Sequence, residues 1–468
     1  MKLVKQAVIY LLASAATLAF IALLLDAGPA PGTATALPTA AAGAPGLLAG
    51  LQAQVHHPLS QLFIQLLVVI GAAQLVGRMF TRFGLPAVVG EMAAGIVLGP
   101  SLLGHLAPAA FAFVFPAESL GALKLFSQIG ICLFMFAVGM ELKIEHLRHR
   151  VQSAVAVSHA SIAVPFAFGV LLAFLLFDSM AGTAASFRSF ALFMGISLSI
   201  TAFPVLARIL QERGLTATPL GSTAIACAAV DDVTAWSIMA FVVAISRSSS
   251  LAGAGLTLGL ALLFVAAMLL LVRRVLPRWL DLGRPEPSSA TLATVLCVMI
   301  AASLCTELIG IHALFGAFLA GTVMPEAHDF RERIRVRVEK FSSVLLLPLF
   351  FAYTGLRTEL GLLDSAQDWL WCLAIVALAS LGKLGASAVA ARWTGMAWRE
   401  ALQLGALMNT RGLMELIALN IGYDLGILSP RIFTMLVLMA LVTTFMTGPL
   451  LSWFQRAPRR AARTAVNA

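Results

Sequence analysis

Charged residues are scarce in this chain of 468 residues. Asp, Glu, Lys and Arg make up 11% of the sequence, whereas hydrophobic residues make up 60%. A soluble globular domain carries about 25% charged residues, so this scarcity excludes that class. Together with a mean hydropathy of +0.95, the composition predicts a protein that crosses a lipid bilayer many times.

Cysteines and the signatures of enzymes are also rare. No nucleophile with a nearby base and no Gly-rich phosphate loop stands out, so we predict neither an enzyme nor a bound cofactor.

The net charge of +9 could indicate nucleic acid binding, but the basic residues form small clusters between apolar segments, which membrane topology explains better. The five cysteines lie in apolar segments without metal-ligand spacing, which predicts packing residues and no resident metal at Cys132, Cys227, Cys297, Cys305 and Cys372.

The apolar segments predict an all-α membrane protein with about 13 transmembrane helices. If the first span enters from outside, every cytoplasmic loop holds a cluster of Lys and Arg, and every outer loop holds at most one. This positive-inside pattern predicts a cytoplasmic C-terminus, in a bacterial inner membrane. The spans are centred near residues 71, 94, 131, 164, 199, 232, 264, 300, 320, 350, 380, 412 and 443.

The ends of the chain differ from the hydrophobic part. Residues 1–26, with Lys2 and Lys5 before an apolar run, are either a signal peptide or an extra span. Residues 27–58 are rich in Ala, Pro and Gly, which predicts a flexible linker. A transmembrane domain over 59–455 follows, and 456–468 form a basic cytoplasmic tail.

Three sequence motifs occur twice in the same order. GEMAAGIVLGP, LFMFAVGMEL and GISLSITAFP match GAFLAGTVMP, LPLFFAYTGLRTEL and GALMNTRGLM, respectively. The offset spans an odd number of segments, which predicts two inverted repeats of about six helices each, the architecture of secondary transporters. We place the repeats at about 61–246 and 290–455, joined by a linking span at 252–276. The alternative is a shared preference of packed helices for small residues.

Two adjacent aspartates, Asp231 and Asp232, lie in the middle of an apolar span. A carboxylate inside a bilayer is costly unless it is protonated, paired or solvated, so acids at such positions usually bind protons or cations. Because a proton and a cation would compete for the same oxygens, this pair predicts an antiport site. The alternative is a carboxylate pair neutralised within the bundle and without a role in transport.

Lys383 is the one lysine that lies well inside a span. Its side chain could extend to the membrane surface, as long basic side chains near helix ends do. It could instead pair with Asp231 or Asp232, which would lower the cost of burying both charges.

Two spans at matching repeat positions contain helix-breaking residues. Pro204 removes a backbone hydrogen bond near Thr201 in the first. The second contains weak helix formers beside two charges, at Asn409, Thr410, Arg411, Gly412 and Glu415. Two interrupted helices at such positions predict a binding site where they cross. The alternative is one proline kink plus an ordinary ion pair between Arg411 and Glu415.

The motifs AVDDVTAW, ITAFPVLARIL, VVGEMAAGIVLGPSLLG and NTRGLMELIALNIG resemble those of the second cation:proton antiporter family, which includes sodium/proton antiporters, Kef-type systems and plant exchangers. The resemblance implies that Asp232 carries both cation and proton. It implies that Lys383 pairs with Asp231 and that exchange is electrogenic. It also implies a homodimer in which a dimer-forming panel supports a moving core.

We therefore predict a secondary antiporter that exchanges Na⁺ or K⁺ for protons by alternating access. NTRGLMEL is closer to the plant branch, where potassium is a common substrate, so the sequence leaves the cation open. One alternative is a gated potassium channel whose flux is not coupled to protons. Another is a membrane scaffold or sensor that transports nothing.

Overall fold

The computed structural model describes residues 54–55, 57–82, 87–141, 151–216, 218–247, 251–283 and 286–455. The predicted signal peptide or extra span, nearly all of the predicted linker and the basic tail lie outside these residues. In the described part, eleven helices have the length and composition to cross a bilayer. Together with a shorter apolar helix near residue 320 and a pair of half-helices around residue 412, they account for all thirteen predicted centres.

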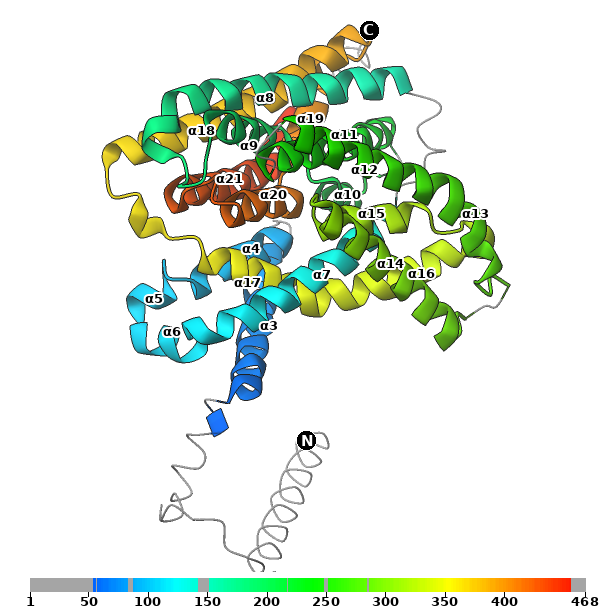
Figure 1. Cartoon of the computed structure of the whole chain (residues 1–468). Helices are drawn as coiled ribbons and strands as arrows, with labels where there is room; N and C mark the ends of the chain where they lie inside the picture. The colour runs from blue at the N-terminus through cyan, green and yellow to red at the C-terminus, as the bar shows by residue number, and fades with distance from the viewer. Residues whose placement is uncertain are drawn as a thin grey trace, which may run out of the picture. The chain divides into compact units, whose positions relative to one another are not determined.

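The helices pack into two bundles (Figure 1). The panel bundle consists of α3 (Pro58–Arg82), α4 (Ala87–Leu98), α7 (Leu120–Glu141), α14 (Ser289–Ile309), α15 (Ala313–Thr322), α16 (Phe330–Phe341) and α17 (Leu347–Leu356), with the short α5 (Leu103–Leu106) and α6 (Pro108–Val114) beside α3 and α4. The core bundle consists of α8 (Val151–Met180), α9 (Phe187–Ser199), α10 (Phe203–Glu212), α11 (Pro219–Arg247), α18 (Ala366–Trp393), α19 (Trp398–Met408), α20 (Leu413–Asp424) and α21 (Pro430–Gln455).

One helix links the two bundles. α12 (Leu251–Ala267) contacts α11 of the core bundle and α14 of the panel bundle. It continues through a π-helical turn, Met268–Val272, into the short α13 (Arg273–Val275). Its large side chains are mostly exposed, as expected for a helix that faces lipid.

Glycines of the repeated motifs set the helix contacts of the panel bundle. A Cβ atom added to Gly95 of α4 would lie 2.1 Å from the carbonyl oxygen of Phe351, and one added to Gly355 would meet the Gly95 backbone at 2.0 Å. Gly139 of α7 and Gly321 of α15 are in equally close contact with each other's helices. Small residues allow such close packing where lipid removes the hydrophobic drive for helices to associate.

Both predicted helix interruptions occur in the core bundle. α9 ends at Ser199, residues 200–202 are not helical, and α10 begins at Phe203 with Pro204 in its first turn. Pro204 therefore lies just after the break, where a missing N–H costs little. The second break separates α19 from α20, and Gly412 has a φ of +151°, which a residue with a side chain rarely adopts.

Candidate ion-binding site

Asp231 and Lys383 form an ion pair in the interior of the core bundle. Lys383 Nζ lies 3.0 Å from Asp231 Oδ2, and neither side chain is exposed. Lys383 also donates a hydrogen bond to the carbonyl oxygen of Ser199, at the end of α9. The lysine is therefore directed into the bundle and does not extend to the membrane surface.

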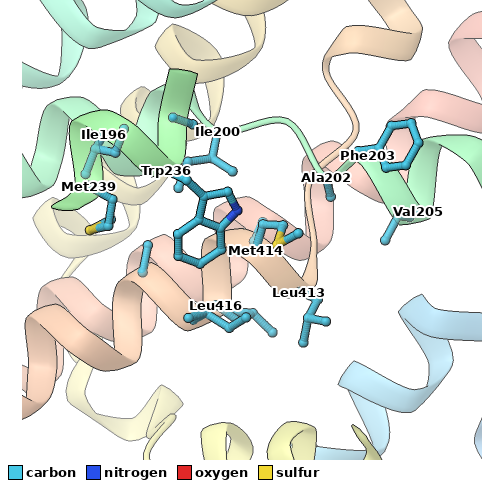
Figure 2. Close-up of a cluster of buried hydrophobic side chains, with 14 of the residues drawn as sticks. Ile196, Ile200, Ala202, Phe203, Val205, Trp236, Met239, Leu413, Met414 and Leu416 are labelled. Atoms are coloured by element: carbon cyan, nitrogen blue, oxygen red, sulfur yellow. The ribbon is translucent and has the colours of Figure 1, made fainter. Parts of the chain in front are cut away.

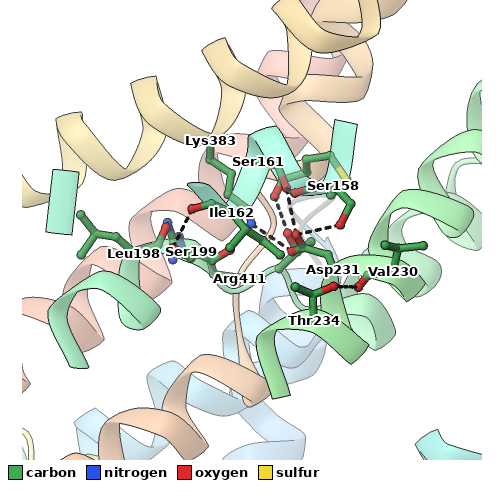
Figure 3. Close-up of polar contacts among 12 residues, drawn as sticks. Ser158, Ser161, Ile162, Leu198, Ser199, Val230, Asp231, Thr234, Lys383 and Arg411 are labelled. Carbon is green, nitrogen blue, oxygen red and sulfur yellow. Dashed lines mark hydrogen bonds and ion pairs between the residues drawn. The ribbon is translucent and has the colours of Figure 1, made fainter. Parts of the chain in front are cut away.

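The second carboxylate oxygen of Asp231 is bound by serines of α8 (Figure 3). Ser161 Oγ donates to Asp231 Oδ1 at 2.9 Å, and Ser158 Oγ lies 3.5 Å from the same oxygen. Both oxygens of Asp231 thus have partners, so its charge is neutralised and solvated by the protein itself. Sequence reasoning gave neither serine a role.

Asp232 has no such environment. Its side chain is 1% exposed, and within the described residues neither of its carboxylate oxygens has a hydrogen-bond partner. A carboxylate without partners in an apolar interior is unfavourable as a bare anion. The arrangement therefore leaves both oxygens free to hold a proton or a cation.

A cavity of about 1360 Å³ lies between the two bundles, lined by residues of both. On α11 its lining includes Ile225, Ala226 and Ala229. Asp232 lies three residues beyond Ala229, which is the next position on the same helix face. The panel bundle supplies four acidic side chains to the lining, Glu91, Glu141, Glu332 and Glu339.

The cavity opens at the end of the molecule that carries clustered basic residues. Its lining includes Arg78, Arg208 and Arg335. Arg335 bridges two acids of its own helix, at 2.6 Å from Glu332 and 2.5 Å from Glu339. Sequence reasoning assigned no function to Glu91 and did not single out Glu141, since only the fold shows that both face this cavity.

The two chain breaks cross and bind each other directly. The backbone N–H of Ala202 donates to the carbonyl oxygen of Thr410 at 3.0 Å. Thr201 Oγ1 donates to the carbonyl oxygen of Met408 at 3.2 Å. Figure 2 shows apolar side chains around this crossing, among them Ile200, Trp236 and Met414. Backbone groups that two complete helices would have satisfied internally are therefore paired across the crossing.

Arg411 and Glu415 balance the ends of the half-helices. Arg411 is fully buried and donates to the carbonyl oxygens of Ser197, at 2.7 Å, and Leu198. Its cation thus lies at the negative C-terminal end of α9. Glu415 lies in the first turn of α20, at the positive end, and its Oε2 atom is 3.3 Å from Arg411 Nη1.

The structure gathers the predicted site residues into one region but gives them different surroundings. Asn409 is fully buried, and both polar atoms of its amide lack a hydrogen-bond partner among the described residues. The hydroxyl groups of Thr410 and Thr447 lie 3.3 Å apart. The partners of Asp231 on α8 could only have been suspected from the SHAS sequence, which places two serines three residues apart on one helix face.

Residues 66–457 match the family model described as sodium/hydrogen exchanger, transmembrane. The chain is 44% identical over 396 residues to the Na⁺/H⁺ antiporter NhaS4 of Synechocystis sp., covering 84% of this chain and 97% of that protein. It is 38% identical to cation/H⁺ antiporter 17 of Arabidopsis thaliana and 33% identical to K⁺/H⁺ antiporter 1 of Saccharomyces cerevisiae. These alignments cover 85% and 86% of this chain but only 48% of each of those two longer proteins.

The fold also matches a solved structure. The sodium proton antiporter MjNhaP1 of Methanocaldococcus jannaschii superposes with a TM-score of 0.62, covering 85% of this chain and 97% of that one. The sequence identity is 14%, so this likeness concerns the fold alone.

Proposed function

The chain belongs to the sodium/hydrogen exchanger family of cation:proton antiporters, and we propose that it exchanges Na⁺ or K⁺ for protons at Asp232. It is an integral, multi-pass membrane protein and a transporter rather than an enzyme. The observation that carries the proposal is the contrast between two neighbouring carboxylates. Asp231 is neutralised by Lys383, whereas both oxygens of Asp232 lack partners in the described structure, three residues beyond Ala229, which lines a large cavity.

Competition at Asp232 explains the coupling. Either a proton or a monovalent cation can neutralise the carboxylate, and the two cannot occupy the same oxygens together. If the core bundle moves against the panel bundle only when Asp232 is neutralised, each inward movement with a proton is matched by an outward movement with a cation. In the homodimer that the resemblance implies, the two panel bundles would form the dimer interface, and the core bundle of each subunit would move against them.

The Asp231 and Lys383 pair sets the charge moved per cycle. Exchange of one cation for one proton at Asp232 alone moves no net charge. A second proton is carried if the ion pair separates and Asp231 is protonated during the proton-loaded half of the cycle. One net charge then moves, and a potential of 100 mV contributes about 2.3 kcal/mol per turnover.

The basic residues around the cavity support an orientation. Arg78, Arg208 and Arg335 line the cavity and belong to the basic clusters that the positive-inside pattern places on the cytoplasmic side. In this orientation, the cavity opens to the cytoplasm.

The proposal is tested in acidified everted vesicles that contain the protein. Na⁺, Li⁺ or K⁺ is added separately, and proton release is followed with a pH-sensitive dye. We expect a cation-dependent response that is lost in Asp232→Asn. Asp178→Asn is the matched control, because Asp178 is an exposed carboxylate of α8, and this variant should keep the full response.

The same experiment separates the alternatives. Cation flux without proton movement would support an uncoupled channel. No flux of either ion, with a phenotype unchanged by Asp232→Asn, would support a scaffold or sensor.

A further inference from the structure

The interface between the two bundles is open at one end and closed at the other. The cavity at the arginine-rich end measures about 1360 Å³. At the opposite end the same interface holds only about 30 Å³, lined by residues that include Ser127, Tyr353, Asn420 and Asp424. This volume fits roughly two water molecules, so the interface between the described residues is nearly closed at that end.

A polar network spans the interface at this closed end. Asp424, the last residue of α20, lies 2.6 Å from Arg357 Nη2 through Oδ1 and 3.1 Å from Lys124 Nζ through Oδ2. Arg357 Nη1 donates to Asn420 Oδ1 at 3.0 Å, and Asn420 Nδ2 donates to Thr354 Oγ1 at 2.9 Å. One core carboxylate is thus held by two panel cations.

Aromatic rings hold the arginine in place. The guanidinium carbon of Arg357 lies 4.3 Å from the ring centre of Tyr353 and 4.9 Å from that of Tyr423. Arg357 also donates to the hydroxyl of Tyr353. Tyr353 belongs to α17 of the panel bundle and Tyr423 to α20 of the core bundle, so the guanidinium is bound from both sides of the interface.

The helix that this network holds is part of the ion site. α20 begins at the second chain break and carries Glu415 in its first turn. Movement of the core bundle against the panel bundle therefore has to separate Asp424 from Lys124 and Arg357.

The degree of burial makes this network suitable for repeated separation. The side chains of Asp424 and Lys124 are 32% and 36% exposed, and that of Arg357 is 14% exposed. Partly exposed ions lose little hydration when they pair, so the desolvation penalty is small. When the pair separates, water can take the place of the lost partner. The buried pair of Arg411 and Glu415, with 0% exposure, lacks this property and joins residues of the core bundle only.

We propose that Asp424, Arg357 and Lys124 form an outer lock, which keeps the outer path to Asp232 closed and separates when the site turns outward. The inference rests on alternating access in the proposed function. The predicted topology places Lys124 and Arg357 in outer loops, so the lock faces away from the cytoplasm.

The first test measures access and does not depend on transport. In a variant without the five native cysteines, Ser127→Cys places a thiol in the small closed cavity, where Ser127 is 1% exposed. Intact right-side-out vesicles are treated with a membrane-impermeant thiol reagent. Adding Asp424→Asn or Arg357→Gln should raise the outer labelling rate several-fold.

The control is an ion pair at the same end that joins two helices of one bundle. Arg431 Nη1 lies 3.6 Å from Asp368 Oδ1, and both residues belong to the core bundle. Arg431→Gln should leave labelling unchanged. Equal labelling in the unlocked variants and this control would overturn the lock.

A second test keeps the lock closed instead of opening it. Lys124→Cys and Asp424→Cys are combined in the same cysteine-free variant and joined by a short bifunctional thiol reagent with a cleavable disulfide. Cation-dependent proton release should be lost on cross-linking and return on reduction. Full exchange by the cross-linked protein would overturn the lock, whereas no exchange by the uncross-linked wild type would instead contradict the proposed antiport.

Discussion

At the scale of single residues, Asp231 and Asp232 show that position in a helix decides the role of a carboxylate. Successive residues of a helix point about 100° apart, so the two side chains face different surroundings. Asp231 faces Lys383 and Ser161, and Asp232 faces neither. The residues alone predict the cost of both acids and an intramembrane lysine partner but leave open which aspartate the lysine contacts, whereas the family resemblance implies Asp231, the partner that the structure has.

Loss of the Lys383 side chain should lower the stability of the folded protein. Lys383→Met leaves Asp231 buried without a cation, and breaking a buried pair costs about 3–5 kcal/mol. We expect a marked fall in the midpoint of thermal unfolding of the purified protein in detergent. Lys340→Met, at an exposed lysine of α16, is the matched control and should unfold near the wild-type temperature.

A second variant identifies the cause of the loss. Lys383→Met combined with Asp231→Leu removes both charges and should recover much of the stability, because an apolar pair can replace an ion pair at little cost. If the double variant were as unstable as the sum of the single changes, the ion pair would not be the source of the effect.

At the scale of the helices, the two interrupted elements follow from few residues. Pro204 and Gly412 predict breaks, and the structure has breaks beside both. The hydrogen bonds across the crossing could not be predicted, because they depend on where distant helices place their carbonyl groups. Arg411 illustrates this limit. Its sequence neighbours suggest an ion pair with Glu415, but the fold adds the end of α9 as a partner.

Gly412→Ala should strain the second break. The native φ of +151° disfavours a side chain, and the added Cβ would lie 3.0 Å from Val205 Cγ2 on α10. A residue forced into such a conformation costs about 1–3 kcal/mol. We expect a lower unfolding temperature and slower exchange, measured on the same purified and reconstituted protein.

The matched control for this variant is Gly255→Ala in α12. A Cβ atom there meets nothing within 4 Å, and alanine is favoured over glycine in a helix by up to about 1 kcal/mol. This variant should be as stable as the wild type or more stable. If both variants behaved alike, strain at the crossing would not explain the loss.

At the scale of the whole molecule, the sequence predicts the number of spans and their alternation better than their grouping. Clusters of arginine follow every second span, and an error in the span count would destroy that pattern. Division into a panel bundle and a core bundle depends on long-range contacts, such as that between Gly95 and Gly355. Glycine motifs indicate that helices pack closely but not which partner each one meets. The cavity between the bundles was therefore not predictable.

The cavity should be accessible from the cytoplasmic side of the membrane. Ala229 lines the cavity and is 8% exposed, whereas its neighbour Ala228 is 0% exposed and does not line it. In the variant without native cysteines, Ala229→Cys should react with an impermeant thiol reagent in everted vesicles, where the cytoplasmic side faces the medium. Ala228→Cys should not react there.

Labelling of Ala229→Cys only in right-side-out vesicles would reverse the proposed orientation, since the cavity would then open outward despite its arginines. Na⁺ or K⁺ could also slow the labelling of Ala229→Cys from the cytoplasmic side. That result would place the bound cation near the face of α11 that carries both Ala229 and Asp232.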